Sequence, residues 1–147
     1  MREALKLNIT TNNEFSNKII GLIEKSKKSI VQVINSQMVM TYWNIGKEIF
    51  LEEQNGLDRA EYGKEVISNL STILTEKYGK GFSSSNLKRM RKFYTIFNDE
   101  KIGATVSHQF SWSHFVEFIK IDDSIKREFY LTMCANEGWS IRTLKER

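Results

Sequence analysis

Proline is absent from the 147 residues, and cysteine occurs once, at Cys134. The single cysteine excludes an internal disulfide and any cysteine-rich zinc site. Because it shares an apolar helical pattern with Tyr130 and Met133, we predict a buried residue there and not a catalytic thiol. The lack of proline and the many Lys, Glu, Leu and Ile residues favour an all-α fold.

Long hydrophobic runs are absent as well. One of the longest, residues 19–23, covers five positions, whereas a membrane-spanning helix needs about 20 apolar residues. No stretch resembles a signal peptide either. The sequence therefore predicts a cytoplasmic protein with no membrane partner.

Catalytic and metal-binding patterns are also missing. Neither His108 nor His114 has a carboxylate at metal-ligand spacing beside it, and we expect a hydrogen-bonding or surface role for both. Residues 79–81 place a glycine on each side of a lysine, but without the spacing of a phosphate-binding loop. Adjacent carboxylates at Asp122 and Asp123 point apart on a helix, and a helix cap explains them. We expect no enzymatic activity, no cofactor and no small-molecule substrate.

The domain organisation follows from length and periodicity. With 40% hydrophobic residues, the chain can bury one core without disulfides. Residues 1–13 show no sustained period and are expected to form a flexible lead-in. Residues 14–147 are expected to form a single compact domain of several helices.

Apolar residues recur at helical spacing from Phe15 to Glu53, and one long helix or two helices in line fit this pattern equally well. Asn55 and Gly56 provide a stop. At most a short extended piece, not a sheet, is expected at 105–109. Further helices are expected at about 59–78, 84–98, 111–121, 123–137 and 141–147, with caps at Ser83 or Ser84, Asp122 or Asp123, and Ser140.

The helices at about 59–78 and 84–98 are joined by a turn of about four residues that contains Gly79 and Gly81. Two helices joined by so short a glycine-bearing turn are typical of helix-turn-helix proteins, which present the second helix to the major groove of DNA. Phe82 is expected to pack back onto that helix. Its inward residues are expected to be Leu87, Met90, Tyr94 and Phe97.

Positive charge is concentrated in the same segment. Residues 77–98 contain six cations and no acidic residue, while the rest of the chain carries 16 cations and 18 acids. A solvated helix face normally mixes both signs, because like charges at i,i+4 spacing destabilise a helix. The unmixed segment indicates that the balancing negative charge comes from a partner.

The second helix of this pair and the turn before it are therefore the predicted nucleic-acid surface. Ser and Asn in the first helical turn can hydrogen-bond base edges, and Lys and Arg can reach guanine or phosphate. The alternative is that the serines only cap the helix and the cations only keep its face soluble. The candidate contact residues are Lys80, Ser84, Ser85, Asn86, Lys88, Arg89, Arg91 and Lys92.

Six segments together resemble one protein family. They are "TYWNIGKEI" (41–49), "YGKEVISNLSTIL" (62–74), "GFSSSNLKRMRKFY" (81–94), "QFSWSHF" (109–115), "REFYL" (127–131) and "EGWSIRTLKER" (137–147). In this order they resemble the N-terminal domain of the bacterial YhcG-type nucleases of the PD-(D/E)XK superfamily. The resemblance implies a DNA-processing context and a longer protein that continues into a nuclease domain. The metal-binding carboxylates and lysine of such a domain have no counterpart here.

Two functions follow as hypotheses. The first is a non-catalytic module that binds DNA, with RNA as a second choice, and positions an attached nuclease domain. The second is a protein-interaction or dimerisation module, in which the helix at 15–53 exposes an apolar stripe that a partner covers. Trp112 and Trp139 are expected in the core, and the segment 111–114 is either a second functional surface or a packing element.

Overall fold

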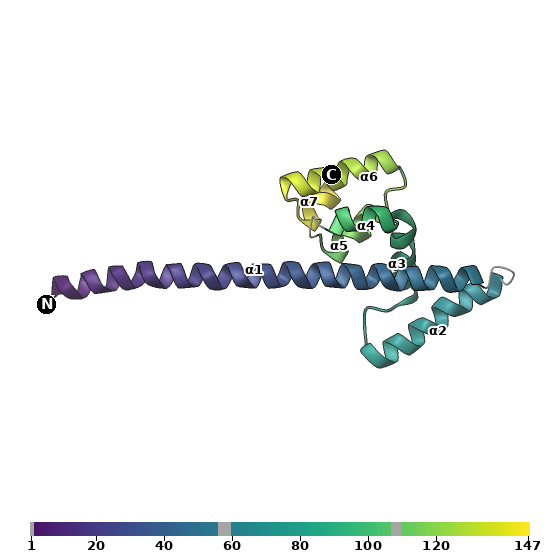
Figure 1. The fold of residues 1–147 in the computed structure, drawn as a ribbon, viewed down its shortest axis with the longest axis horizontal. Helices are drawn as coiled ribbons and strands as arrows, with labels where there is room; N and C mark the ends of the chain where they lie inside the picture. Colours follow the sequence, from purple (N-terminus) through teal and green to yellow (C-terminus); the bar gives the residue numbers. More distant parts are fainter. Residues whose placement is uncertain (1, 56–59, 107–109) are drawn as a thin grey trace. The chain divides into compact units, whose positions relative to one another are not determined.

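The computed structural model describes residues 2–55, 60–106 and 110–147, with side-chain surroundings for 13–55, 65–99, 101–103 and 110–147. These residues form seven α-helices and no strand, so the predicted all-α fold is confirmed (Figure 1). Contacts divide the chain into two units, residues 1–34 and 35–147. The helices are α1 (Arg2–Asn55), α2 (Ala60–Tyr78), α3 (Ser84–Ile96), α4 (Asp99–Val106), α5 (Trp112–Ile119), α6 (Ser124–Glu137) and α7 (Ile141–Glu146).

The first helix settles one open alternative. α1 is a single continuous helix, so the one-helix interpretation of residues 15–53 is correct. It begins at Arg2, inside the segment that the sequence places in a lead-in, and it ends at Asn55. Gly56, the second residue of the predicted stop, lies outside the described residues.

Several helix ends are set by the residues that the sequence predicts. The side chains of Ser83, Asp123 and Ser140 each accept a hydrogen bond from a backbone N–H in the first turn of α3, α6 and α7, respectively. Gly138 closes α6 with φ 64° and ψ 37°. Glycine occupies this left-handed conformation without the steric penalty of a Cβ atom. Local sequence therefore fixes where these helices begin and end.

The segment 99–106 differs from the sequence-based expectation. The pattern predicts a polar connection with at most an extended piece at 105–109, whereas α4 covers Asp99–Val106. Residues 107–109 lie outside the described part of the chain. One buried side chain, Ile102, anchors α4 in the larger apolar cluster. The segment DEKIGATV shows no sustained apolar period in the sequence, so no helix is predicted from its pattern.

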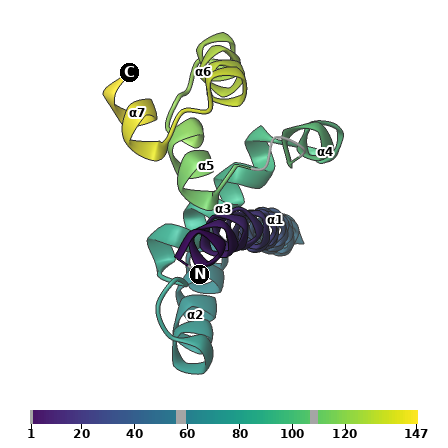
Figure 2. The same cartoon turned by 90° about the vertical axis from the view of Figure 1, so that its left-hand side faces the viewer.

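The unit of residues 35–147 contains two clusters of buried apolar side chains, and α3 contributes to both. Phe93 lies in the larger cluster, whereas Leu87 and Met90 lie in the smaller one. Trp112 packs against both clusters. Figures 1 and 2 show α2 on one side of the C-terminal part of α1 and α5 on the other. The helix α3 is therefore central to the packing of this unit.

The buried face of α3 is largely the predicted one. Leu87, Met90 and Phe97 are buried, as expected, and Tyr94 is half-buried. Phe93, which is not among the residues predicted to point inward, is fully buried as well. Its ring lies 4.7 Å from that of Phe115 on α5 and 5.3 Å from that of Trp112.

Trp43 and Gly46 supply two of the contacts between α1 and α3. A Cβ atom at Gly46 would overlap the carbonyl group of Met90 and would stand 3.1 Å from the backbone nitrogen of Arg91. The two helix backbones therefore approach each other at a point where only glycine fits. One helical turn earlier, the indole Nε1 of Trp43 donates a buried hydrogen bond of 2.6 Å to the carbonyl oxygen of Phe97. That bond satisfies an acceptor at the C-terminal end of α3.

Replacing Gly46 with alanine should lower the free energy of unfolding by about 1–3 kcal/mol, because the added methyl group forces α1 and α3 apart. Urea denaturation measures the change. The matched control is Gly103→Ala in α4, where a Cβ atom meets nothing within 4 Å. Alanine there should instead stabilise the helix by up to about 1 kcal/mol. Equal stability of Gly46→Ala and the wild type would contradict the close approach of the two helices.

Candidate nucleic-acid interface

The connection between α2 and α3 depends on two glycines with positive φ angles. Gly79 has φ 82° and Gly81 has φ 113°, a region that other residues rarely adopt. The hydroxyl of Ser71 on α2 donates a 2.8 Å hydrogen bond to the carbonyl oxygen of Phe82. Phe82 itself packs against the cluster of Leu87, as the sequence predicts. The start of α3 is thus fixed against α2.

Asn86, one of the predicted contact residues, is engaged on both sides of its amide. Its Nδ2 donates a 2.5 Å hydrogen bond to the carbonyl oxygen of Gly81, and its Oδ1 accepts a 3.2 Å hydrogen bond from the indole Nε1 of Trp112. The side chain therefore joins the turn, α3 and α5. We assign Asn86 to positioning the first turn of α3.

The predicted cations fall into two groups, and the first group is free. Lys80, Lys88 and Arg89 are exposed, and none of them has a hydrogen-bond or ion-pair partner among the described residues. Lys88 lies on the side of α3 opposite the buried residue Met90, and Arg89 lies exposed beside the buried face. Their charges are therefore available to an external anion.

Arg91 belongs to the second group, the cations with an internal partner. Its Nη1 donates to both carboxylate oxygens of Glu53 on α1, at 2.9 and 2.7 Å. The two side chains are 33% and 21% exposed, so this charge-assisted pair is partly shielded from water. Glu53 already neutralises Arg91, which makes Arg91 a link between α3 and α1.

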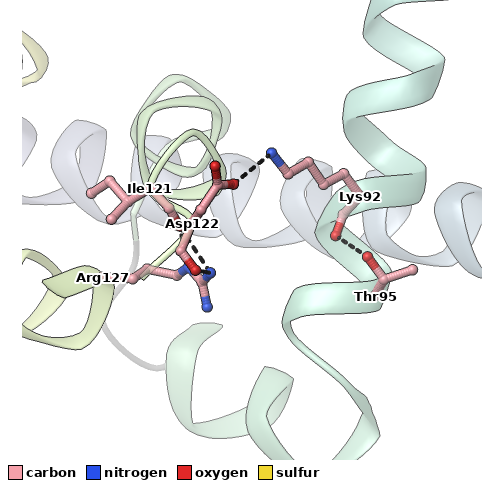
Figure 3. A network of polar contacts seen from close by, with 5 residues as sticks. All are labelled: Lys92, Thr95, Ile121, Asp122 and Arg127. Atoms are coloured by element: carbon pink, nitrogen blue, oxygen red, sulfur yellow. Dashed lines mark hydrogen bonds and ion pairs between the residues drawn. The ribbon is translucent and has the colours of Figure 1, made fainter. Parts of the chain in front are cut away.

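Lys92 also has an acidic neighbour, although a weaker one. Its Nζ lies 3.7 Å from Oδ1 of Asp122, in the connection between α5 and α6 (Figure 3). Arg127 holds that connection by donating to the carbonyl oxygens of Ile121 and Asp122. Because both partners of the ion pair are exposed, the pair contributes little stability, and Lys92 can exchange Asp122 for another anion.

The predicted serines differ in accessibility. Ser84 is half-buried, whereas Ser85 is exposed in the first turn of α3. Helical spacing places Ser85 on the same side as Lys88, Arg89 and Lys92. The structure thus gathers these four residues on one face of α3, with Lys80 in the turn before it.

The segment 111–114 has a packing role. Ser111 caps α5, and its Oγ lies 2.9 Å from Nδ1 of His114. Nε2 of His114 lies 3.0 Å from the carbonyl oxygen of Trp139, so a proton on Nε2 completes both hydrogen bonds. The hydrogen-bonding role predicted for His114 is confirmed, whereas His108 lies outside the described residues. Trp112 is half-buried, with its ring 5.0 Å from that of Tyr42.

Cys134 is buried, as predicted, and this burial raises the pKa of its thiol. A thiol held in its protonated form is a poor nucleophile. Within the described ranges, no three His, Cys, Asp or Glu side chains come together as metal ligands. No described helix is long and apolar enough to cross a membrane.

The sequence matches a known protein family. The family model of the DUF1016 N-terminal domain matches residues 18–147, which include α2, α3 and the free cations. The chain belongs to this family. One curated relative, named "Putative nuclease YhcG", from Escherichia coli (strain K12), is 30% identical over 158 residues. The predicted resemblance is therefore confirmed.

The chain corresponds to only part of this relative. The match covers 88% of the chain and 42% of the relative, so the chain spans about two fifths of the relative's length. No solved structure matches the chain.

The two groups of cations should respond differently to truncation. Arg91→Ala should lower the free energy of unfolding by on the order of 1 kcal/mol, because it leaves Glu53 partly buried without its partner. Arg89→Ala, two residues away on the same helix, should change it by less than about 0.5 kcal/mol. Urea denaturation of both variants at low salt measures the difference. Equal effects of the two substitutions would show that the Glu53 pair does not stabilise the domain.

Proposed function

We propose that this domain is a non-catalytic DNA-binding module in which α3 and the turn before it contact the nucleic acid. The observation that carries the proposal is the pair of exposed cations, Lys88 and Arg89, which have no partner among the described residues. They lie in a segment of 22 residues, 77–98, without a single acidic side chain. A phosphate backbone supplies the missing negative charge.

The start of α3 adds a second kind of contact. The first backbone N–H groups of a helix and its dipole attract phosphate oxygens. Ser85 is exposed there and can donate to or accept from a base edge. The short turn with Gly79 and Gly81 supports a helix-turn-helix arrangement, in which α2 steadies α3 against the major groove.

The contact surface proposed from the structure is smaller than the set predicted from sequence. Lys80, Lys88 and Arg89 supply three unpaired cations, and Lys92 can add a fourth after it leaves Asp122. Each phosphate contact with duplex DNA contributes about −0.9 to the slope of log K against log salt concentration. Three to four contacts predict a slope of about −2.7 to −3.6.

The comparison with the relative supports a role beside a nuclease. The relative is named as a nuclease, and this chain matches less than half of it. We therefore propose that the domain positions an attached nuclease domain on DNA and takes no part in bond cleavage. Exposed cations that contact phosphates contribute binding affinity and orientation, and they need not take part in the cleavage reaction.

The proposal is tested by titrating fluorescent duplex and single-stranded DNA with the protein at several salt concentrations. The double variant Lys88→Ala, Arg89→Ala should weaken binding at least about tenfold near 100 mM salt and reduce the slope by about 1.8. A fall in affinity with no change in slope would contradict the assignment of these residues to phosphate contacts.

The matched control removes one lysine and one arginine elsewhere, in Lys126→Ala, Arg142→Ala. Both side chains are exposed on α6 and α7, away from the segment 77–98. This variant has the same net charge as the Lys88, Arg89 variant, and it should bind close to wild type. Equal loss of binding in both variants would mean that net charge, and not α3, determines the affinity.

A further inference from the structure

The N-terminal unit exposes an unusual amount of apolar surface. Between residues 13 and 34, every side chain is exposed except the half-buried Gln32. Nine large apolar side chains in this stretch are 39–67% exposed: Phe15, Ile19, Ile20, Leu22, Ile23, Ile30, Val31, Val33 and Ile34. Single exposed apolar residues need no explanation, but a contiguous patch of this kind marks an interaction surface.

These side chains follow a seven-residue pattern. Ile19, Ile23, Ser26, Ile30 and Val33 are separated by alternating steps of four and three, which is the spacing of the core positions of a coiled coil. The positions that flank this seam hold Phe15, Ile20, Leu22 and Ile34, one serine, Ser29, and Lys27 as the one charged residue. The seam and its flanks thus form one broad apolar side.

The opposite side of the same stretch is polar. It carries Lys18, Glu24, Lys25 and Lys28, and Val31 is its only large apolar residue. A helix with one apolar and one charged side is stable in water mainly through the packing of its apolar side. Because this side has no cover in the described residues, a partner has to supply it.

The apolar area of this segment matches that of a small dimer interface. A helix of 20 residues is about 30 Å long and about 10 Å across, and four of every seven positions offer on the order of 600 Å². The smallest specific interfaces bury roughly 600 Å² on each partner. The segment is therefore large enough for a pair that dissociates on dilution.

We propose that residues 15–34 pair with the same segment of a second copy of this chain, as a coiled coil. Core positions occupied by Ile and Val favour helix pairing, and a surface that complements itself needs no different partner. Most charges of the segment lie outside the seam, where they remain in water. This inference does not depend on the proposed DNA binding.

Sedimentation equilibrium of the full chain between about 1 and 200 µM tests the pairing. The wild type should fit a reversible equilibrium between one and two copies. Val33→Glu places a charge in the seam and should raise the dissociation constant at least about 100-fold, because an unpaired charge would be buried.

The matched control is Val31→Glu, the same substitution two residues away on the polar side. Val31 is 55% exposed and Val33 is 67% exposed, so the isolated chain should tolerate both changes alike. The dissociation constant of the Val31→Glu protein should stay within about threefold of the wild type. Equal effects of the two substitutions would overturn the assignment of the seam.

A third variant separates the seam from another apolar surface. Ile73 lines a groove of about 950 Å³ between α1 and α2 of the unit 35–147, and the variant is Ile73→Glu. It should leave the pairing unchanged. If the wild type stays a single copy at 200 µM, the proposal is overturned. This holds whether or not the protein also cosediments with anionic phospholipid vesicles in a separate assay. A dimer lost with Ile73→Glu but kept with Val33→Glu also overturns it.

Discussion

The packing of α1 against α3 at Gly46 is the contact on which the rest of the larger unit depends. Trp43, Gly46, Phe50 and Glu53 recur every three or four residues, so they share one face of α1. Trp43 donates to the carbonyl oxygen of Phe97, and Gly46 leaves room for the backbone of α3. The ring of Phe50 lies 5.4 Å from that of Tyr94, and Glu53 pairs with Arg91. One stripe of α1 therefore fixes the C-terminal half of α3.

This attachment determines which side of α3 meets solvent. The apolar clusters occupy the side of Leu87, Met90 and Phe93, and α1 contacts the adjoining residues. Only the remaining strip, with Lys88 and Arg89, stays free. The same fixation gives α3 a rigid position, which favours binding because little ordering is required when a ligand arrives. Stability of the core and availability of the basic strip are thus consequences of the same contacts.

Much of the fold was predictable because residues close together in the sequence determine where its helices begin and end. The caps at Ser83, Asp123 and Ser140 are read from single residues and their neighbours. Which of the cations have an acidic partner was not predictable in this way. Glu53 and Asp122 are far in sequence from Arg91 and Lys92, and an acid-free segment says nothing about acids that the fold brings to it. The structural role of Asn86 was missed for the same reason, since Trp112 lies 26 residues away.

The placement of the aromatic residues has a consequence for spectroscopy. All three tryptophans belong to residues 35–147, and residues 1–34 contain neither tryptophan nor tyrosine. Indole emission therefore reports only the larger unit, whereas far-ultraviolet circular dichroism also records the amide groups of the first 34 residues. Coincidence of the two signals is the usual criterion for a two-state transition. In this chain the same comparison separates the melting of the N-terminal helical stretch from that of the core, so each part can be followed without a label.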